Sequence, residues 1–506
     1  MRASAPTIAI DPPSRHRNAS SGPPFPDAAA RAADVPLTSR PVPRPSSPPR
    51  ARATFLRWSA SYPPVASVAS GDVVRLWTVS GEPGQVPLDR FDVPASLRAI
   101  WLARCGAPDG SQPGRDPPLR NCGAPGPHVL TGPVAVDGAR AGDVLKVEVL
   151  DAEVAASWGW NAIRRGKGAL ANHPGFEDHP GETLVVPIDL DAGTYDPPWI
   201  PPVKGGEGGP GEGEGEMSED PGEGEGSEDP GSGSGSDPNP EPEFEKKKKK
   251  KKTRTAFTLR EPFFGQMGVA PDPALGEQSS VLPGDYGGNL DNKMLGPGAT
   301  VYFRVNVPGA LFSAGDGHAA QGDGEFCVTA LEACMVGRFR LTVVKADDDS
   351  VTRAEEDSAG DDDSSSSDDD SDSSSPPGRV VDASAANGLS SPRATTATHY
   401  VTMAFAESLD AAETAALVDM LEWMAELTGA DRTSLYRTAS LVADMRVTQV
   451  VNGRKGVHLT MPKSVAHETR ARTRRARRAE GRRGGGEGEE NRANARRDGG
   501  GEKEEL

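Results

Sequence analysis

Two long stretches of the chain, residues 204–245 and 347–375, offer so little apolar surface that they cannot join a folded core. The first holds fourteen acidic residues against one basic residue, and the second holds thirteen against one. Burial in such segments cannot offset the entropy of ordering, so we expect disorder over 204–252 and 347–379. They contribute −13 and −12 to a net charge of −18, which leaves +7 for the rest. The acidic balance therefore does not indicate a cationic partner.

Outside these insertions the sequence is patterned for β-strands. Alternating apolar and β-branched residues, typical of strands with one buried face, mark five regions, at 65–80, 129–151, 183–188, 299–307 and 446–451. Helical periodicity begins only after residue 405. The predicted fold class is therefore mainly β with α additions (α+β), a β-sandwich-like body with C-terminal helices and two disordered acidic insertions.

The helical region carries clear start and stop signals. We expect Ser408 to cap a helix over 409–427 and Gly429 to end it, because a serine oxygen satisfies free amides and glycine tolerates a left-handed cap. Asp431 is expected to cap a second helix over 432–441.

The predicted organisation is one body over 55–465, preceded by a disordered extension over 1–54 and followed by a disordered charged tail over 466–506. The extension is rich in Arg, Ser, Ala and Pro and has no apolar core of the kind that a secretory signal needs. We expect a cytoplasmic protein. The alternative is import into a plastid or mitochondrion through a transit peptide.

Several partner and cofactor classes are not expected. The four cysteines include no Cys-x-x-Cys pair, which indicates reduced thiols rather than a disulfide framework or a cysteine zinc site. No apolar run reaches the roughly 18–20 residues of a membrane helix. The lysine run at 246–252 and the Arg-rich end lack interleaved aromatic residues, so nucleic acid is not an expected partner.

The chemically richest stretch is 308–329. Four ionisable side chains fall within ten residues there, each directly next to a glycine: Asp316, His318, Asp323 and Glu325. Glycine allows positive φ and close approach of a ligand. We expect a polar loop between two buried strands, which is how many catalytic and metal sites are built.

Eight sequence blocks, taken together, resemble the acetamidase/formamidase family. They include Pro-Phe-Phe-Gly-Gln-Met-Gly-Val-Ala-Pro at 262–271 and Gly-Gly-Asn-Leu-Asp at 287–291. The others are 128–133, 142–145, 158–160, 308–329, 398–400 and 447–458. The resemblance implies a β-sandwich with α additions, hydrolysis of short primary amides, and a homo-oligomer. The insertions and both tails have no counterpart in a typical family member.

Amide hydrolysis requires an activated water or nucleophile, a stabilised oxyanion and a protonated leaving nitrogen. Carboxylates and an imidazole suit a divalent metal that activates water, with zinc as the candidate. The predicted metal ligands are Asp323, Asp316, His318, His128 and Asp291. The predicted catalytic residues are Glu325, which we expect to open a strand, with His318 and Asp316.

Three residues are predicted to bind the substrate. Asn289 and Gly288 can offer hydrogen-bond donors to a carbonyl group, and Phe264 can form a pocket wall. An alternative mechanism uses a Cys327 thiolate with His318 or Glu325 as its base. The apolar neighbours of Cys327 favour a buried strand position instead.

The predicted function is hydrolysis of short primary amides, with formamide converted to formate and ammonia. The alternative is a catalytically inactive family member that acts as an interaction scaffold through its charged segments.

Overall fold

The computed structural model describes residues 7–10, 54–55, 57–81, 86–105, 127–200, 256–346, 384–385 and 388–479. The insertions that we predicted to be disordered lie outside these residues. Of the charged segments on which the scaffold alternative depends, the structure describes only the part of the tail up to residue 479.

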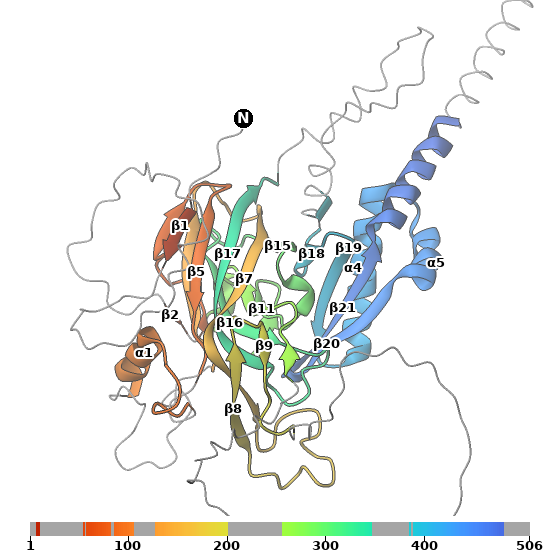
Figure 1. Cartoon of the computed structure of the whole chain (residues 1–506). Helices are drawn as coiled ribbons and strands as arrows, with labels where there is room; N and C mark the ends of the chain where they lie inside the picture. The colour runs from red at the N-terminus through yellow and green to blue at the C-terminus, as the bar shows by residue number, and fades with distance from the viewer. Residues whose placement is uncertain are drawn as a thin grey trace, which may run out of the picture.

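Within the described residues, nineteen strands are hydrogen-bonded into one large sheet, and β12 and β3 form a separate two-stranded sheet. The large sheet curls on itself, with the helices near the C-terminal end lying at one side (Figure 1). The prediction of a mainly β fold with α additions is therefore confirmed.

The strands of the first half are β1 (Thr7–Ile10), β2 (Thr54–Phe55), β3 (Arg57–Trp58), β4 (Ala66–Val68), β5 (Val73–Thr78), β6 (Leu130–Val136), β7 (Val144–Ile163), β8 (Glu182–Asp189) and β9 (Thr194–Tyr195). Those of the second half are β10 (Phe257–Thr258), β11 (Phe263–Gly268), β12 (Gln278–Ser279), β13 (Pro283–Gly284), β14 (Gly287–Asn289), β15 (Thr300–Arg304), β16 (Phe312–Ala320), β17 (Leu331–Val344), β18 (Arg393–Thr395), β19 (His399–Ala406), β20 (Asp444–Asn452) and β21 (Arg454–Pro462).

The two predicted helices form at the places that their capping signals indicate, whereas α1 (Ala95–Cys105) was not expected, because helical periodicity begins only after residue 405 in the sequence. The Ser408 hydroxyl accepts a hydrogen bond from the amide of Ala411 at 3.2 Å, and Gly429 ends α4 at φ 69°. The Asp431 carboxylate accepts from the amide of Ser434 at 2.9 Å and begins α5. Both predicted helices are confirmed to within one residue. The helical elements are α1 (Ala95–Cys105), the 3-10 turns η3 (Pro273–Leu275) and η4 (Lys293–Leu295), α4 (Leu409–Thr428), α5 (Arg432–Val442) and a helix over 463–479.

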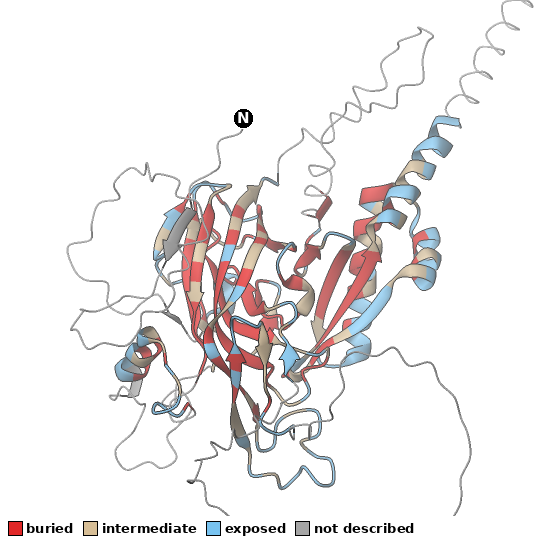
Figure 2. Ribbon diagram, viewed as in Figure 1, coloured by how far each residue is buried: buried red, intermediate tan, exposed pale blue. Residues whose placement is uncertain are grey.

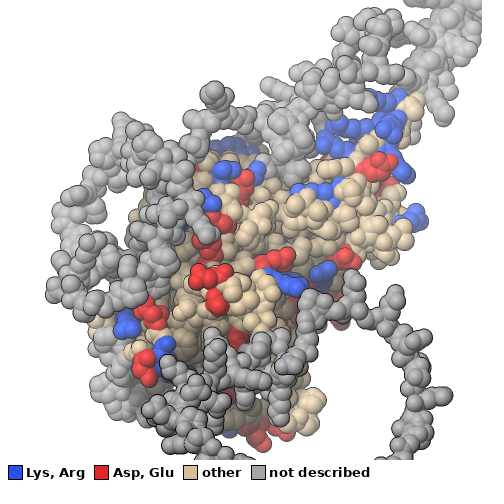
Figure 3. Space-filling view, in the orientation of Figure 1, with Lys and Arg blue, Asp and Glu red and all other residues tan. Residues whose placement is uncertain are grey.

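The structure differs from the predicted boundaries at both ends of the body. β1 pairs in parallel with β5, so the extension over 1–54 is not wholly unstructured. Residues 463–479 are helical, although we expected a disordered tail from residue 466. Alanine and arginine favour helix formation, and Glu468 pairs with Arg472 one turn later at 2.7 Å. Lys and Arg side chains gather along this helix (Figure 3).

The main hydrophobic core lies inside the curled sheet, where buried residues predominate (Figure 2). Phe264, Phe312 and Phe339 meet in its centre, with ring centroids 5.2 and 5.4 Å from that of Phe339. Phe264 is fully buried there. The prediction that Phe264 forms a pocket wall is therefore wrong, because its ring is used to fill the core.

Two long strands form the frame on which the chemically active residues are placed. β7 and β17 pair antiparallel from Glu332 opposite Trp160 to Val344 opposite Val144. β16 pairs with the start of β17 and, on its other side, with β11. None of the described helices is long and apolar enough to cross a membrane.

Candidate active site

The stretch predicted to be a polar loop contains a strand in its middle. Asp316 and His318 lie in that strand, β16, which is bonded to β6, β11 and β17, whereas residues 308–311 and 321–329 are not in a strand. Glycine and aspartate favour turns by composition. Here the two glycines serve close packing instead: a Cβ at Gly315 would lie 2.4 Å from the Val129 carbonyl oxygen, and one at Gly317 2.6 Å from Met335.

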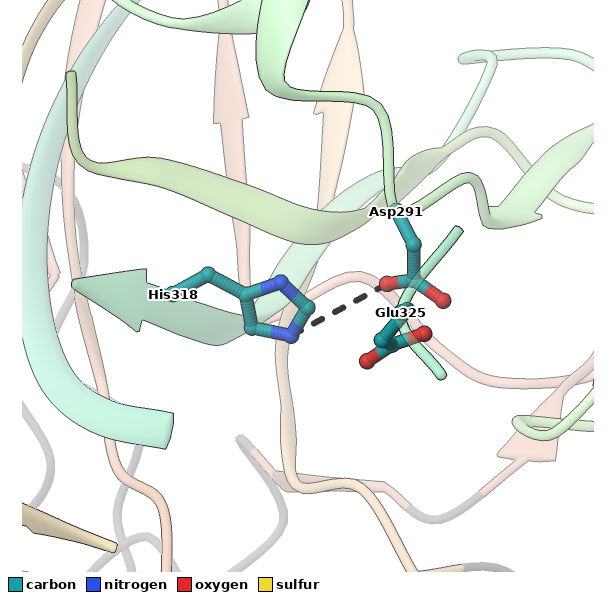
Figure 4. Close-up of side chains that lie close together, drawn as sticks. All are labelled: Asp291, His318 and Glu325. Atoms are coloured by element: carbon teal, nitrogen blue, oxygen red, sulfur yellow. Dashed lines mark ion pairs between the residues drawn. The ribbon is translucent and has the colours of Figure 1, made fainter. Parts of the chain in front are cut away.

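His318 is the centre of a buried cluster of carboxylates. Its Nε2 atom lies 3.4 Å from Asp316 Oδ2, 3.5 Å from Glu332 Oε1 and 3.8 Å from Asp291 Oδ1. Glu325 lies next to Asp291 and faces the same imidazole edge (Figure 4). The five side chains are at most 6% exposed. Four acids and one imidazole therefore share a single site that excludes most solvent.

The register of the sheet explains why Glu332 joins this cluster. His318 in β16 is paired with Glu332 in β17. Directly paired residues on neighbouring strands project their side chains to the same face of a sheet. Glu332 is anchored further by the amide of Ala330, which donates to Oε1 at 3.1 Å.

Hydrogen bonds on the far side fix the orientation of the imidazole. His318 Nδ1 lies 2.7 Å from Gln321 Oε1, and Gln321 Nε2 donates to the Asp291 carbonyl oxygen at 2.7 Å. Because Gln321 Oε1 can only accept, Nδ1 carries the proton in this arrangement. Nε2 is therefore the atom presented to the carboxylates.

Two distant segments hold Asp291. Its amide donates to the Gly265 carbonyl oxygen at 3.1 Å, and its Oδ2 accepts a hydrogen bond from Asn452 Nδ2 in β20. The second carboxylate oxygen, Oδ1, is left facing His318. Gly265 lies next to the carboxylates of Asp291 and Asp316, since a Cβ atom at Gly265 would lie 2.5 Å from Asp291 Oδ1 and 2.8 Å from Asp316 Oδ2. The absence of a side chain at Gly265 keeps the space between the two carboxylates open.

Three of the four acids have a strained backbone conformation. Asp291, Asp316 and Glu325 have φ values of 45°, 55° and 43°, in the left-handed region. This conformation costs roughly 1–2 kcal/mol for a residue with a Cβ atom. Such strain persists where the surrounding structure imposes it, and it is typical of functional sites.

Glu325 was predicted to open a strand, and that prediction is wrong. It follows Gly324 in a loop, and β17 starts only at Leu331. Gly324 forms a parallel bridge with Gln449: its amide donates to the Thr448 carbonyl oxygen at 3.0 Å, and its carbonyl accepts from the amide of Val450 at 3.2 Å. β20 therefore holds the backbone next to Glu325, as it holds the side chain of Asp291.

The electrostatics reflect the crowding of like charges. Burial raises the pKa of Glu325 and of Glu332 well above the usual range, and raises that of Asp291 to about 7. Burial acts in the same direction on Asp316, but the positive charges of His128 and His318 hold its pKa below the usual range. Burial alone would lower the pKa of His318, yet the surrounding carboxylates, Glu332 foremost, raise it.

Several polar atoms of the cluster are buried without a hydrogen-bond partner. They are Asp291 Oδ1, His318 Nε2, Glu325 Oε2 and Glu332 Oε2. Unpaired buried polar atoms are costly, so their convergence calls for a ligand. Two sets of three donors have ligand atoms within 4.8 Å of one another: Asp291, His318 and Glu325, and Asp316, His318 and Glu332. Carboxylate oxygens with one imidazole nitrogen suit a hard or borderline divalent cation.

A cavity of about 200 Å³ opens beside the cluster. Asp316 and Glu332 line it, together with His128, Asn452 and Thr329. His128 Nε2 lies 3.7 Å from Asp316 Oδ2, and its Nδ1 lies 2.8 Å from the Ser280 carbonyl oxygen. Asp291, His318 and Glu325 do not contribute to the cavity wall. The set of Asp316, His318 and Glu332 is therefore the one in contact with the cavity.

Some predicted site residues lie elsewhere. Asp323 pairs with Lys293 at 3.0 Å and belongs to neither donor set. Asn289 is occupied by Gln266 and by the Val281 carbonyl oxygen, and Gly288 is paired within the sheet. Neither residue lines the cavity.

Cys327 is not a buried strand residue, as its neighbours suggested. It lies in the loop between β16 and β17, with its thiol 3.4 Å from the Thr329 carbonyl oxygen and near Asn161. It does not line the cavity. The geometry gives the thiolate alternative no support.

Sequence reasoning missed four residues of the site: Gly265, Gln321, Glu332 and Asn452. Glu332 carried a usable signal, since it is the one acid in the apolar run 326–337. Gly265 stands between two phenylalanines and a glutamine in a strand, where glycine often marks a close approach. The contacts of Gln321 and Asn452 depend on tertiary structure and gave no local signal.

Comparisons with known proteins agree with the resemblance seen in the sequence. The Acetamidase/Formamidase family model matches residues 115–178 and 263–355. A curated formamidase of Methylophilus methylotrophus is 29% identical over 279 residues, which is 54% of this chain and 59% of the relative. The chain thus matches about three-fifths of that relative's length.

Solved structures extend the comparison to the fold. A predicted acetamidase/formamidase of Thermoanaerobacter tengcongensis superposes with a TM-score of 0.52 at 23% identity, covering 83% of this chain and 96% of the other. An acetamidase of Bacillus halodurans gives a TM-score of 0.50 at 21% identity, covering 83% and 98%. At these identities the likeness concerns the fold alone.

Proposed function

We propose that the chain, which matches the Acetamidase/Formamidase family model over residues 115–178 and 263–355, hydrolyses short primary amides, formamide among them, to a carboxylate and ammonia. One observation carries the proposal: unpartnered polar atoms of Asp291, His318, Glu325 and Glu332 converge in a buried site next to a small cavity. A structural role alone gives no reason to bury four acids around one imidazole, because each unpaired atom lowers stability.

We further propose that Asp316, His318 and Glu332 hold a divalent cation, for which zinc is the candidate. The donor set fits, since these three residues offer two carboxylates and an imidazole nitrogen within 4.8 Å. A bound cation of this kind supplies Lewis-acid chemistry, which polarises a carbonyl oxygen and acidifies water. The hydrogen bond from His318 Nδ1 to Gln321 Oε1 would fix the orientation of the imidazole as a metal ligand.

The remaining residues orient the substrate and move protons. His128 donates from Nδ1 to the Ser280 carbonyl oxygen, which leaves Nε2, at the cavity, as the atom that takes up or releases a proton. We assign to His128 the transfer of a proton to the leaving nitrogen. Asn452 also lines the cavity, and its side-chain oxygen Oδ1 can accept a hydrogen bond from the carboxamide nitrogen of a substrate.

The direct test is ammonia release by the purified full-length protein. With formamide, acetamide and propionamide as substrates, we expect ammonia in equal amount to the carboxylate formed. Dialysis against a chelator is expected to lower the rate by at least about a hundredfold, and one equivalent of zinc is expected to restore it. The melting temperature is expected to fall after dialysis, because the buried carboxylates then repel one another. Full activity without stoichiometric metal would contradict the cation proposal, and no hydrolysis by the metal-loaded protein would contradict amide hydrolysis.

Replacing Asn452 by alanine is expected to weaken cation binding and turnover about 10- to 100-fold, the usual effect of disturbing the groups around a metal ligand. Asp291 is not one of the three proposed ligands, but it lies 3.8 Å from one of them, His318. The reason is that Asp291 Oδ2 loses its side-chain donor, and the carboxylate is then free to turn away from His318. Isothermal titration with zinc and steady-state rates measure the two effects. Asn306→Ala is the matched control, since Asn306 Nδ2 also donates one hydrogen bond, to the Ala270 carbonyl oxygen, but lies outside the cluster. Equal losses in both variants would point to general destabilisation.

A further inference from the structure

The cavity is lined by both polar and apolar side chains. We call Asp316, Glu332 and His128, beside the cluster, its polar end; Ser80, Lys167, Thr329 and Asn452 are the other polar residues of the lining. The apolar wall is the set of Val79, Val129, Trp160, Val281, Val328 and Val451. A carboxamide needs only the polar end, so the apolar wall requires a separate explanation.

Part of this wall is a continuous apolar surface. Val79, Val129 and Trp160 belong to one hydrophobic cluster, packed against α1 residues such as Leu97 and Trp101. The Trp160 indole nitrogen donates to Ser80 Oγ at 3.2 Å, and the Arg164 guanidinium lies 5.4 Å from the ring centroid. The indole is therefore held in one orientation, and its contact with the cavity is a fixed surface. Rigid apolar surfaces bind apolar groups without the cost of ordering side chains.

The volume exceeds what the smallest amide can fill. A heavy-atom position takes roughly 30 Å³, by analogy with one water molecule in the liquid. Formamide has three heavy atoms and would occupy roughly half of a cavity of about 200 Å³. Space for further heavy atoms therefore remains beside formamide.

We propose that this wall is an acyl-binding subsite, and that the preferred substrates are primary amides whose acyl groups are apolar and three to five carbons long. The inference rests on the proposed amide hydrolysis and names the substrate class of the same site. The amide group occupies the polar end, and the alkyl chain displaces water from the wall. Each methylene that reaches the wall is expected to raise kcat/KM about fourfold, until the cavity is full.

The test is a homologous series. The metal-loaded full-length protein is assayed with formamide, acetamide, propionamide, butyramide, valeramide and octanamide. We expect kcat/KM to rise over the first members by at least tenfold in total and to fall at octanamide. A profile that is highest at formamide and declines from there overturns the acyl subsite and leaves amide hydrolysis standing. A protein that hydrolyses none of the six amides overturns both proposals.

A cavity-filling variant tests the location of the subsite. Val281→Phe places a larger side chain in the cavity wall. It is expected to lower kcat/KM for valeramide at least tenfold and for formamide less than threefold. Val185→Phe is the matched control: Val185 is also a partly buried valine, on β8, but it does not line the cavity. A loss of the same size for both substrates in Val281→Phe, or the same selectivity change in Val185→Phe, would overturn the placement.

Discussion

Replacing His318 by glutamine is expected to lower amide turnover by about a thousandfold or more, the largest effect of any substitution proposed for this chain. The imidazole Nε2 is the one nitrogen donor within a group of four buried acids, and it belongs to both candidate donor sets. Glutamine retains a polar side chain of similar length, but its amide is a poor ligand for zinc. We therefore expect the bound metal to fall well below one equivalent, as measured by elemental analysis, together with the loss of ammonia release.

His399→Gln is the control for this substitution. His399 lies in β19, is only partly buried and bonds to Thr398 rather than to any acid of the cluster. Its replacement is expected to leave metal content and turnover within twofold of the parent protein. His318→Gln protein that melts cooperatively, binds one equivalent of zinc and retains normal turnover would remove His318 from the proposed site.

Replacing Gly265 by alanine is the second large effect, and we expect a loss of activity of about a hundredfold or more from one added methyl group. That methyl would lie 2.5 Å from Asp291 Oδ1, 2.8 Å from Asp316 Oδ2 and 2.8 Å from His318 Cε1. Contacts this short force the carboxylates apart. Displacements of about 1 Å can cost a hundredfold in rate. Steady-state rates and zinc titration of the variant measure both consequences.

Gly296→Ala is the matched control, because Gly296 is also buried and a Cβ there would approach nothing closer than 3.4 Å. It is expected to keep its activity and zinc affinity. If the Gly265→Ala protein binds as much metal as the parent protein and turns over substrate at the same rate, then the open space between the carboxylates of Asp291 and Asp316 has no role in function.

Local signals in the sequence were sufficient for α4 and α5 and for some of the strands, but α1, which lies well before residue 405, and the helix over 463–479 were not predicted. Ser408 and Gly429 are cap residues whose preferred conformations depend on neighbours a few positions away, so α4 was predictable to within one residue. The β16 strand was not predictable in the same way. Its sequence is composed of residues that favour turns, and only the three strands packed around it impose an extended conformation.

The candidate site was predicted in part, for a similar reason. Asp316, His318 and Glu325 were evident because they lie close together in the sequence, and Asp291 and His128 because they fall in blocks that resemble the family. Asp323 belonged to the same stretch, yet a salt bridge with Lys293 holds it away from the imidazole. Glu332 enters the site through strand register, and Asn452 enters it from a hairpin more than one hundred residues later. Sequence proximity cannot reveal such contacts.

The hairpin of β20 and β21 has a consequence for how the protein is made. It supplies the side-chain amide of Asn452 to Asp291 and bonds to the backbone at Gly324, so two of the four acids depend on a segment that is synthesised more than one hundred residues after them. A nascent chain shorter than about 450 residues carries the acids without their restraints. We therefore expect Asp291 and Glu325 to reach their final arrangement only after this hairpin has been synthesised and has packed against them.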